Sequence, residues 1–160
     1  MHFQDLDIRI GKINGVKEHP NADRLYIISV EVGSISRDIE IISGIRDHYI
    51  KDELLGKKIV VLINLEPATL RGIESNGMLL AAVYTDNVVL LTTNKSVPGN
   101  RVYIKGMERK KPKKRIGIED WKKIKLVTLN NKVKFEDYFL RTDKEEIFTD
   151  KEVPDGCNIR

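Results

Sequence analysis

The chain has 160 residues, of which 41% are hydrophobic and 32% charged, a composition typical of one globular domain with room for an appendage. No apolar run approaches the ~20 residues that a membrane helix needs, and the first residues, MHFQDLDIRIG, carry acids where a signal peptide carries positive charge. The single cysteine, Cys157, excludes an internal disulfide framework and fits a reducing compartment. We therefore expect a cytoplasmic protein without membrane segments.

The net charge of +4 is mild, but its distribution along the chain is uneven. The window from Lys105 to Lys125 holds ten basic and three acidic residues, or +7, so the remaining residues carry −3. A basic patch on a slightly acidic protein indicates a polyanionic partner that is contacted at one place. The competing interpretation is that ERKKPKKR is only a solvated linker.

Residues 1–106 are rich in β-branched runs, and the order of these runs predicts an all-β fold. GSIS separates two of the runs and predicts a hairpin, and YIKDELLGKK predicts one short helix that ends at Gly56. Five or six short strands with a small helix between the third and fourth are typical of a five-stranded OB-fold barrel. The predicted strands are LDIRIGKINGVKEH, LYIISVEV, RDIEIISG, KIVVLIN, GMLLAAVY and VVLLTT, and SVPGNRVYI closes this part of the chain.

The barrel pattern breaks at GMERKKPKKR, which is polar, contains Pro112 and lacks apolar periodicity. We therefore divide the chain into a barrel at 1–106, a basic linker at 107–117 and a C-terminal extension at 118–160. The extension again shows apolar alternation around an NN turn, but it is too short to form an independent core. We expect it to dock onto the barrel.

Catalytic and metal sites find little support in the sequence. RGIESNGMLL places Ser75 near a G-x-S-x-G pattern, but the glycine spacing is wrong and a strand former follows where a helix is required. HPNADRL holds His19, Asn21 and Asp23, yet no second histidine or cysteine is near, and Asn and Asp after a proline are ordinary turn residues. No phosphate-binding glycine loop occurs. We expect no catalytic residue, no metal and no cofactor.

The motifs LDIRIGKI, HPNADRLYIISVEVG, IISGI, GKKIVVLINLEPATLRGIESNGMLLAA and VPGNRV, in this order, resemble the tRNA-binding OB domain of aminoacyl-tRNA synthetases and their cofactors. That family includes a free-standing bacterial protein, C-terminal appendages of methionyl- and tyrosyl-tRNA synthetases, and endothelial monocyte-activating polypeptide II. The tail, from WKKIKLVTLNNKVKF to PDGCNIR, is similar to the extra module of the last branch. In that branch the module packs on the barrel and imitates a dimer contact, which implies a monomer.

The resemblance implies a set of tRNA-binding residues. On the loop and its neighbours these are Ser43, Arg71, Ser75, Asn76 and Met78, with Lys12 and Arg24 as flanking cations. The linker supplies a phosphate-contacting edge of Arg109, Lys110, Lys111, Lys113, Lys114 and Arg115. Each has a structural alternative, because Met78 can cap the core and Ser43 and Ser75 can close turns.

The family often has lysines where this chain has Glu66 and Thr69, so we expect the linker to compensate. The resemblance implies a non-catalytic module that recognises general tRNA shape and assists a synthetase, as its appendage or as a cofactor in a multi-synthetase complex. The abrupt start at MHFQDLD suits an excised C-terminal domain as well as a free protein. Alternatives are a cytokine-like docking module, with RIGKING as its signal, and a general single-strand binder, which would need exposed aromatics.

Overall fold

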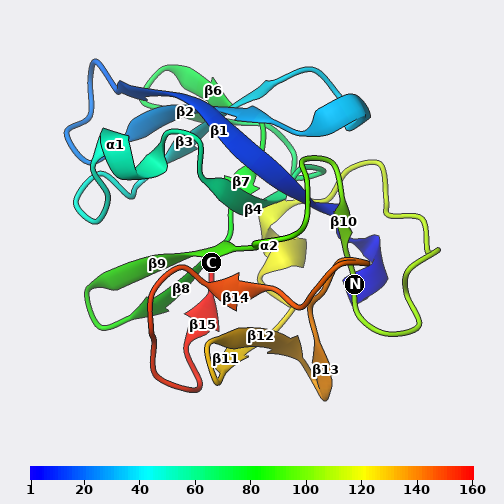
Figure 1. Ribbon diagram of the computed structural model, residues 1–160. Coiled ribbons are helices and arrows are strands. Elements are labelled where there is room, and N and C mark those ends of the chain that lie inside the picture. Colours follow the sequence, from blue (N-terminus) through cyan, green and yellow to red (C-terminus); the bar gives the residue numbers. More distant parts are fainter.

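The computed structural model describes residues 1–160, and the upper half of the molecule in Figure 1 is a small β-barrel. Its sheet runs in the order β3-β2-β1-β4-β7, and β10 pairs with the first two residues of β1. All of these pairings are antiparallel. The strands are β1 (Ile8–Glu18), β2 (Tyr26–Glu31), β3 (Ile39–Ser43), β4 (Lys58–Leu62), β7 (Met78–Leu79) and β10 (Arg101–Val102).

The longest strand, β1, is the centre of the barrel, because it pairs with β2, β4 and β10. Its register with β2 shifts between Ile13 and Gly15, a bulge that bends the strand around the barrel. A Cβ on Gly11 would lie 2.5 Å from Cγ1 of Val30, so this position has no room for a side chain. RIGKING therefore forms the most heavily paired strand of the sheet.

The expected small helix lies between the third and fourth strands, as α1 (Lys51–Leu54), and is shorter than its sequence pattern. It ends just before Gly56, whose φ of +80° is the left-handed conformation that glycine adopts most easily. Two 3-10 turns, η1 (Phe3–Asp5) and η2 (Gly33–Ile35), precede β1 and follow β2.

The lower half of the molecule in Figure 1 is a second sheet, to which both the barrel region and the extension contribute strands. Its strands pair in the circuit β11-β15-β8-β9-β14-β12-β11, so the sheet closes on itself, and β13 extends from β12. A closed sheet leaves few unpaired backbone groups. The strands are β8 (Ala81–Tyr84), β9 (Asn87–Thr92), β11 (Leu126–Leu129), β12 (Lys132–Phe135), β13 (Tyr138–Phe139), β14 (Phe148–Thr149) and β15 (Asn158–Ile159).

Two hydrophobic clusters explain why the extension folds here. A cluster of 14 buried residues fills the barrel, whereas one of 23 draws side chains from the barrel and from the extension, Trp121 of α2 (Ile118–Trp121) among them. β4 lies between them, because Ile59 and Val61 belong to the first cluster and Val60 and Leu62 to the second. A strand buried on both faces reads as a continuous apolar run, which is the pattern of KIVVL.

The all-β, OB-like fold and the packing of the extension on the barrel are confirmed. The sequence did not indicate that the hairpin β8–β9 leaves the barrel sheet and pairs with β14 and β15 of the extension. Cys157 is buried, and its thiol donates to the carbonyl of Pro154 at 3.1 Å, so it is a structural residue.

Candidate nucleic-acid interface

Two connections of the barrel form one surface: the β1–β2 loop, residues 19–25, and the hairpin of β5 (Ala68–Leu70) and β6 (Ile73–Ser75). His19 is 4% exposed and joins them. Its Nε2 donates to the carbonyl of Leu70 at 3.0 Å, and its Nδ1 accepts from the N–H of Asn21 at 3.0 Å. Since a carbonyl can only accept, the imidazole is neutral with its proton on Nε2. In OB folds these two connections flank the ligand-binding face.

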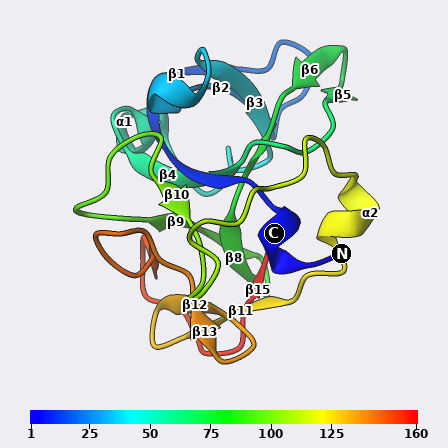
Figure 2. The same ribbon diagram turned by 90° about the vertical axis from the view of Figure 1, so that its right-hand side faces the viewer.

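Arg71 lies at the tip of the β5–β6 hairpin, which Figure 2 shows on the opposite side of the molecule from β11–β13. Leu70 pairs with Ile73, so Arg71 and Gly72 form a two-residue turn with φ values of +52° and +88°. Such turns favour Asn-Gly, because only small or glycine-like residues adopt positive φ easily. An exposed arginine in this conformation indicates that the cation itself is useful at the tip.

Ser75 is buried, with 6% of its surface exposed. Its hydroxyl accepts from the N–H of Ile42 at 2.9 Å and donates to the carbonyl of Gly77 at 3.1 Å. The hydroxyl therefore takes the place of a ladder bond and closes the barrel between β3 and β6. Its side chain is not free for a ligand, which corrects the expectation that it touches RNA, and neither partner is a histidine that could activate it.

Asn76 and Arg115 are brought together by the fold. Both line an open groove of about 470 Å³ beside the β2–β3 loop, together with Asp38 and Glu40. The N–H of Asn76 donates to the carbonyl of Glu40 at 2.9 Å, which holds the backbone at the groove and leaves the side-chain amide without a protein partner. The groove joins the barrel face to the linker.

The flanking candidates lie on β1, on the β1–β2 loop and at the end of β3. Lys12 is exposed on β1 between Glu31 of β2 and Lys58 of β4. Arg24 is highly exposed and pairs with Asp47 at 3.4 Å, an ion pair that solvent weakens. Ser43 is half-buried at the end of β3.

Met78 lies apart from these residues. It pairs with Leu62 in the barrel sheet and packs against the cluster shared with the extension. It lines a different cavity, of about 280 Å³, with Ile118 and Trp121. This supports the interpretation that it caps the core, and its contact with RNA stays a prediction.

The basic linker follows the barrel surface and is anchored at its C-terminal half. Lys113 donates its N–H to the carbonyl of Asp5, and its own carbonyl accepts from Nδ2 of Asn64 at 2.9 Å. Ile116 is buried and pairs with Leu65. The side chains of Arg109, Lys110, Lys111, Lys114 and Arg115 are exposed, and none is in an ion pair. The linker thus presents unpaired positive charge from a constrained backbone.

Aromatic stacking has little support on the barrel. The one strongly exposed aromatic residue is Tyr138, 45% exposed, on β13 of the extension. A general single-strand binder presents aromatic side chains on which bases stack, and the barrel surface offers none that is strongly exposed. No group of three potential metal ligands occurs, and none of the helices has the length and hydropathy to span a membrane.

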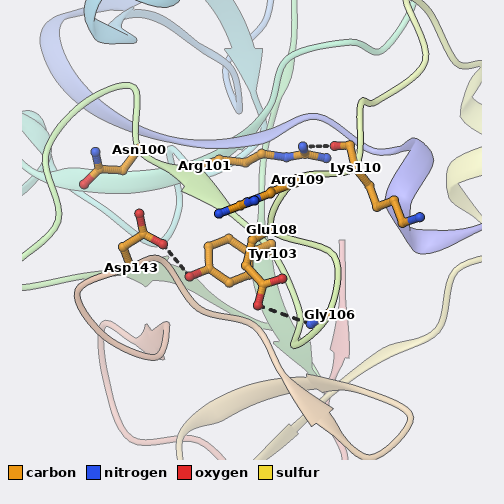
Figure 3. Close-up of a pocket in the computed structure, with 8 residues that line it drawn as sticks. All are labelled: Asn100, Arg101, Tyr103, Gly106, Glu108, Arg109, Lys110 and Asp143. Carbon is orange, nitrogen blue, oxygen red and sulfur yellow. Dashed lines mark hydrogen bonds between the residues drawn. The ribbon is translucent and has the colours of Figure 1, made fainter.

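Two residues, His19 on this surface and Arg101 elsewhere, were not identified as binding or positioning residues from the sequence. In the sequence His19 is an ordinary turn residue, because its hydrogen-bond partner, the carbonyl of Leu70, is 51 positions away. Arg101 of β10 lines a cavity of about 730 Å³ together with Arg109 and Lys110, shown in Figure 3. The sequence offers one indication for Arg101: it lies just before the basic segment that begins at Lys105.

Comparison with known proteins agrees with this geometry. Residues 8–101 match the family described as "Putative tRNA binding domain", and the chain belongs to this family. It is 50% identical over 95 residues to a methionine–tRNA ligase of Thermococcus onnurineus, and 43% identical over 111 residues to a cytoplasmic tyrosine–tRNA ligase of Xenopus laevis. These matches cover 59% and 67% of this chain but only 13% and 21% of the two enzymes.

The likeness to a solved structure extends over nearly the whole chain. The C-terminal domain of Plasmodium vivax p43 superposes with a TM-score of 0.89 and 29% sequence identity, over 99% of each chain. The likeness therefore includes the extension. The CsaA chaperone protein of Picrophilus torridus covers 62% of this chain, with a TM-score of 0.58 and 32% identity, and 92% of its own.

Proposed function

We propose that this chain is a non-catalytic tRNA-binding module that recognises the general shape of tRNA and assists an aminoacyl-tRNA synthetase in the cytoplasm. The observation that carries the proposal is the family match over the barrel, residues 8–101. The similar regions of the methionine– and tyrosine–tRNA ligases are small parts of those enzymes, as expected for an appendage.

The surface supplies suitable chemistry for this function. The hairpin tip and the linker offer cations for phosphate oxygens, and Asn76 offers an amide for a base edge or a 2′-hydroxyl. The absence of exposed aromatic side chains on the barrel fits recognition of a folded RNA better than binding of an unstructured strand.

The cytokine-like alternative requires RIGKING to act as an exposed peptide. In this fold the segment lies in β1, with Ile10, Gly11 and Ile13 buried. Presenting it would require unfolding the centre of the barrel sheet, so the geometry favours the RNA-binding function.

We propose that the chain is a monomer. The pairing of β8 and β9 with β15 and β14 of the same chain supports this, because those strands are not open to a second copy. Sedimentation equilibrium tests the proposal, and a dimer would contradict it.

The test of function is a filter-binding titration with folded tRNA and with single-stranded DNA of equal length, each at two salt concentrations. A tRNA-shape binder holds tRNA more tightly at both, and the logarithm of its affinity falls linearly with the logarithm of salt concentration. Equal affinity for the two nucleic acids, or no binding of either, would contradict the proposal.

A further inference from the structure

The side chain of Arg101 contains an unusual buried atom. Its Nε is buried without a hydrogen-bond partner, and it is the one such side-chain nitrogen or oxygen in the structure. One terminal nitrogen donates to the carbonyl of Lys110, and no carboxylate lies within ion-pair distance. A buried Nε–H without an acceptor is unfavourable, and the half-exposed guanidinium that carries it has no ion-pair partner, so an anion beside it would be stabilising.

Arg101 also lies opposite a like charge, because it pairs with Arg9 across the β1–β10 ladder. Arg9 is satisfied by Asp7 at 2.7 Å and by the carbonyl of Gly99 at 3.2 Å. Burial and the charge of Arg9 lower the pKa of Arg101, whereas Asp7 raises it. Like charges directly opposite in a sheet repel, and an anion beside Arg101 would relieve this repulsion.

Arg101 lines an open cavity of about 730 Å³ between β10, the linker and the extension (Figure 3). The cavity has the volume of a small-ligand site. Arg109 also lines it, and in Figure 3 its guanidinium points back toward Asn100 and Asp143, while the ammonium of Lys110 points the other way. The guanidinium of Arg101 points the opposite way, toward the carbonyl of Lys110, so the two arginines, one from a strand and one from the linker, line the cavity from opposite directions.

The cavity is also lined by two carboxylates, which would repel a free phosphate ion. Asp143 accepts from the hydroxyl of Tyr103 at 2.5 Å, and one oxygen of Glu108 accepts from the N–H of Gly106 at 3.3 Å. The second oxygen of Glu108 has no protein donor. Cations beside a free carboxylate oxygen match a ribose-phosphate unit, in which a phosphodiester lies next to a 2′-hydroxyl donor.

We propose that this cavity holds one ribose-phosphate unit of the RNA backbone, with Arg101 and Arg109 binding the phosphate and Glu108 accepting from the 2′-hydroxyl. This inference rests on the proposed function, because RNA is the ligand. It adds a defined contact to what would otherwise be diffuse attraction by the linker, and it gives a means to distinguish RNA from DNA.

The test compares tRNA affinity for the variants Arg101→Gln, Arg109→Gln and the double variant. Each single change weakens binding about tenfold, as for a charge-assisted hydrogen bond. The double variant weakens it by clearly less than a hundredfold, because both residues bind the same phosphate. Lys144→Gln is the matched control, since Lys144 adjoins Asp143 but does not line the cavity, and its affinity stays within twofold of wild type.

Two outcomes would overturn the inference: no loss from Arg101→Gln, or single losses that simply multiply in the double variant. Glu108→Ala must also lower the preference for tRNA over a DNA copy of the same sequence. If Arg101→Gln does not fold, the Nε–H resonance of Arg101 in the wild-type protein decides, because it must shift when tRNA saturates the protein. Failure of wild-type protein to bind tRNA would instead refute the proposed function.

Discussion

Replacing Arg71 by Asn separates the two roles of the hairpin tip. Arg71 has φ of +52° in a two-residue turn before Gly72. For an L-residue this left-handed conformation costs about 1–2 kcal/mol, and Asn adopts it more easily. Arg71→Asn therefore raises the free energy of unfolding by on the order of 1 kcal/mol and the melting temperature by about 2–4 °C.

The same change removes one cation from the RNA-binding face. Loss of one phosphate contact lowers tRNA affinity about three- to tenfold at low salt and reduces the slope of log affinity against log salt by about 0.9. Thermal unfolding and filter binding over a salt series measure both effects. The expected result is a more stable protein that binds tRNA less well.

Glu136→Asn is the matched control, because Glu136 also has positive φ, +53°, in a two-residue turn, here between β12 and β13 of the extension. It gains comparable stability without loss of tRNA affinity. If Arg71→Asn keeps both the affinity and the salt slope of the wild type, the hairpin tip does not contact RNA and the reasoning fails. Equal losses in both variants would also refute it.

Three further predictions concern other parts of the molecule. His19→Ala removes the hydrogen bond from the β1–β2 loop to Leu70 of the hairpin and the bond to Asn21 within the loop, so it costs about 1–3 kcal/mol in thermal unfolding and weakens tRNA binding. His19→Gln, which can still donate to Leu70, recovers part of the affinity, and equal binding by His19→Ala and wild type would count against this role. Charge reversal of Lys110, Lys111, Lys113 and Lys114 weakens tRNA binding more than Arg71→Ala does, and a titration with the opposite order refutes the linker as the main source of attraction. Burial raises the pKa of the Tyr49 phenol above 10; the charge of Asp150 adds to this shift, and the hydrogen bond from the Leu90 N–H opposes it. The contribution of the protonated phenol to stability is therefore complete below pH 10 and falls as the pH rises further. Between pH 9 and pH 11 the free energy of unfolding, measured with denaturant, should fall less for Tyr49→Phe than for wild type.

The linker and the hairpin loop illustrate what sequence could and could not predict about the site. Charge clustering predicted a basic edge, and the exposed side chains of the linker, all without an ion pair except that of Lys113, which pairs with Asp5, are consistent with it. The loop pattern could not show that Ser75 faces inward, because its partner, the N–H of Ile42, is 33 residues away. The sequence also could not place Arg115 beside Asn76, since this neighbourhood depends on the path of the linker over the barrel.

Local physics explains what the sequence by itself determined: alternation of apolar residues and turn-forming residues predicts short strands, one small helix before Gly56 and an all-β barrel. Composition also predicted that the extension needs the barrel, because so short a segment cannot bury enough apolar surface alone. Tertiary structure alone decided that β8 and β9 close a second sheet with the extension, that His19 joins two loops and that Arg101 has no counter-ion. These features depend on which distant segments meet, and strand pairing and ion pairing across such distances leave no local pattern in the chain.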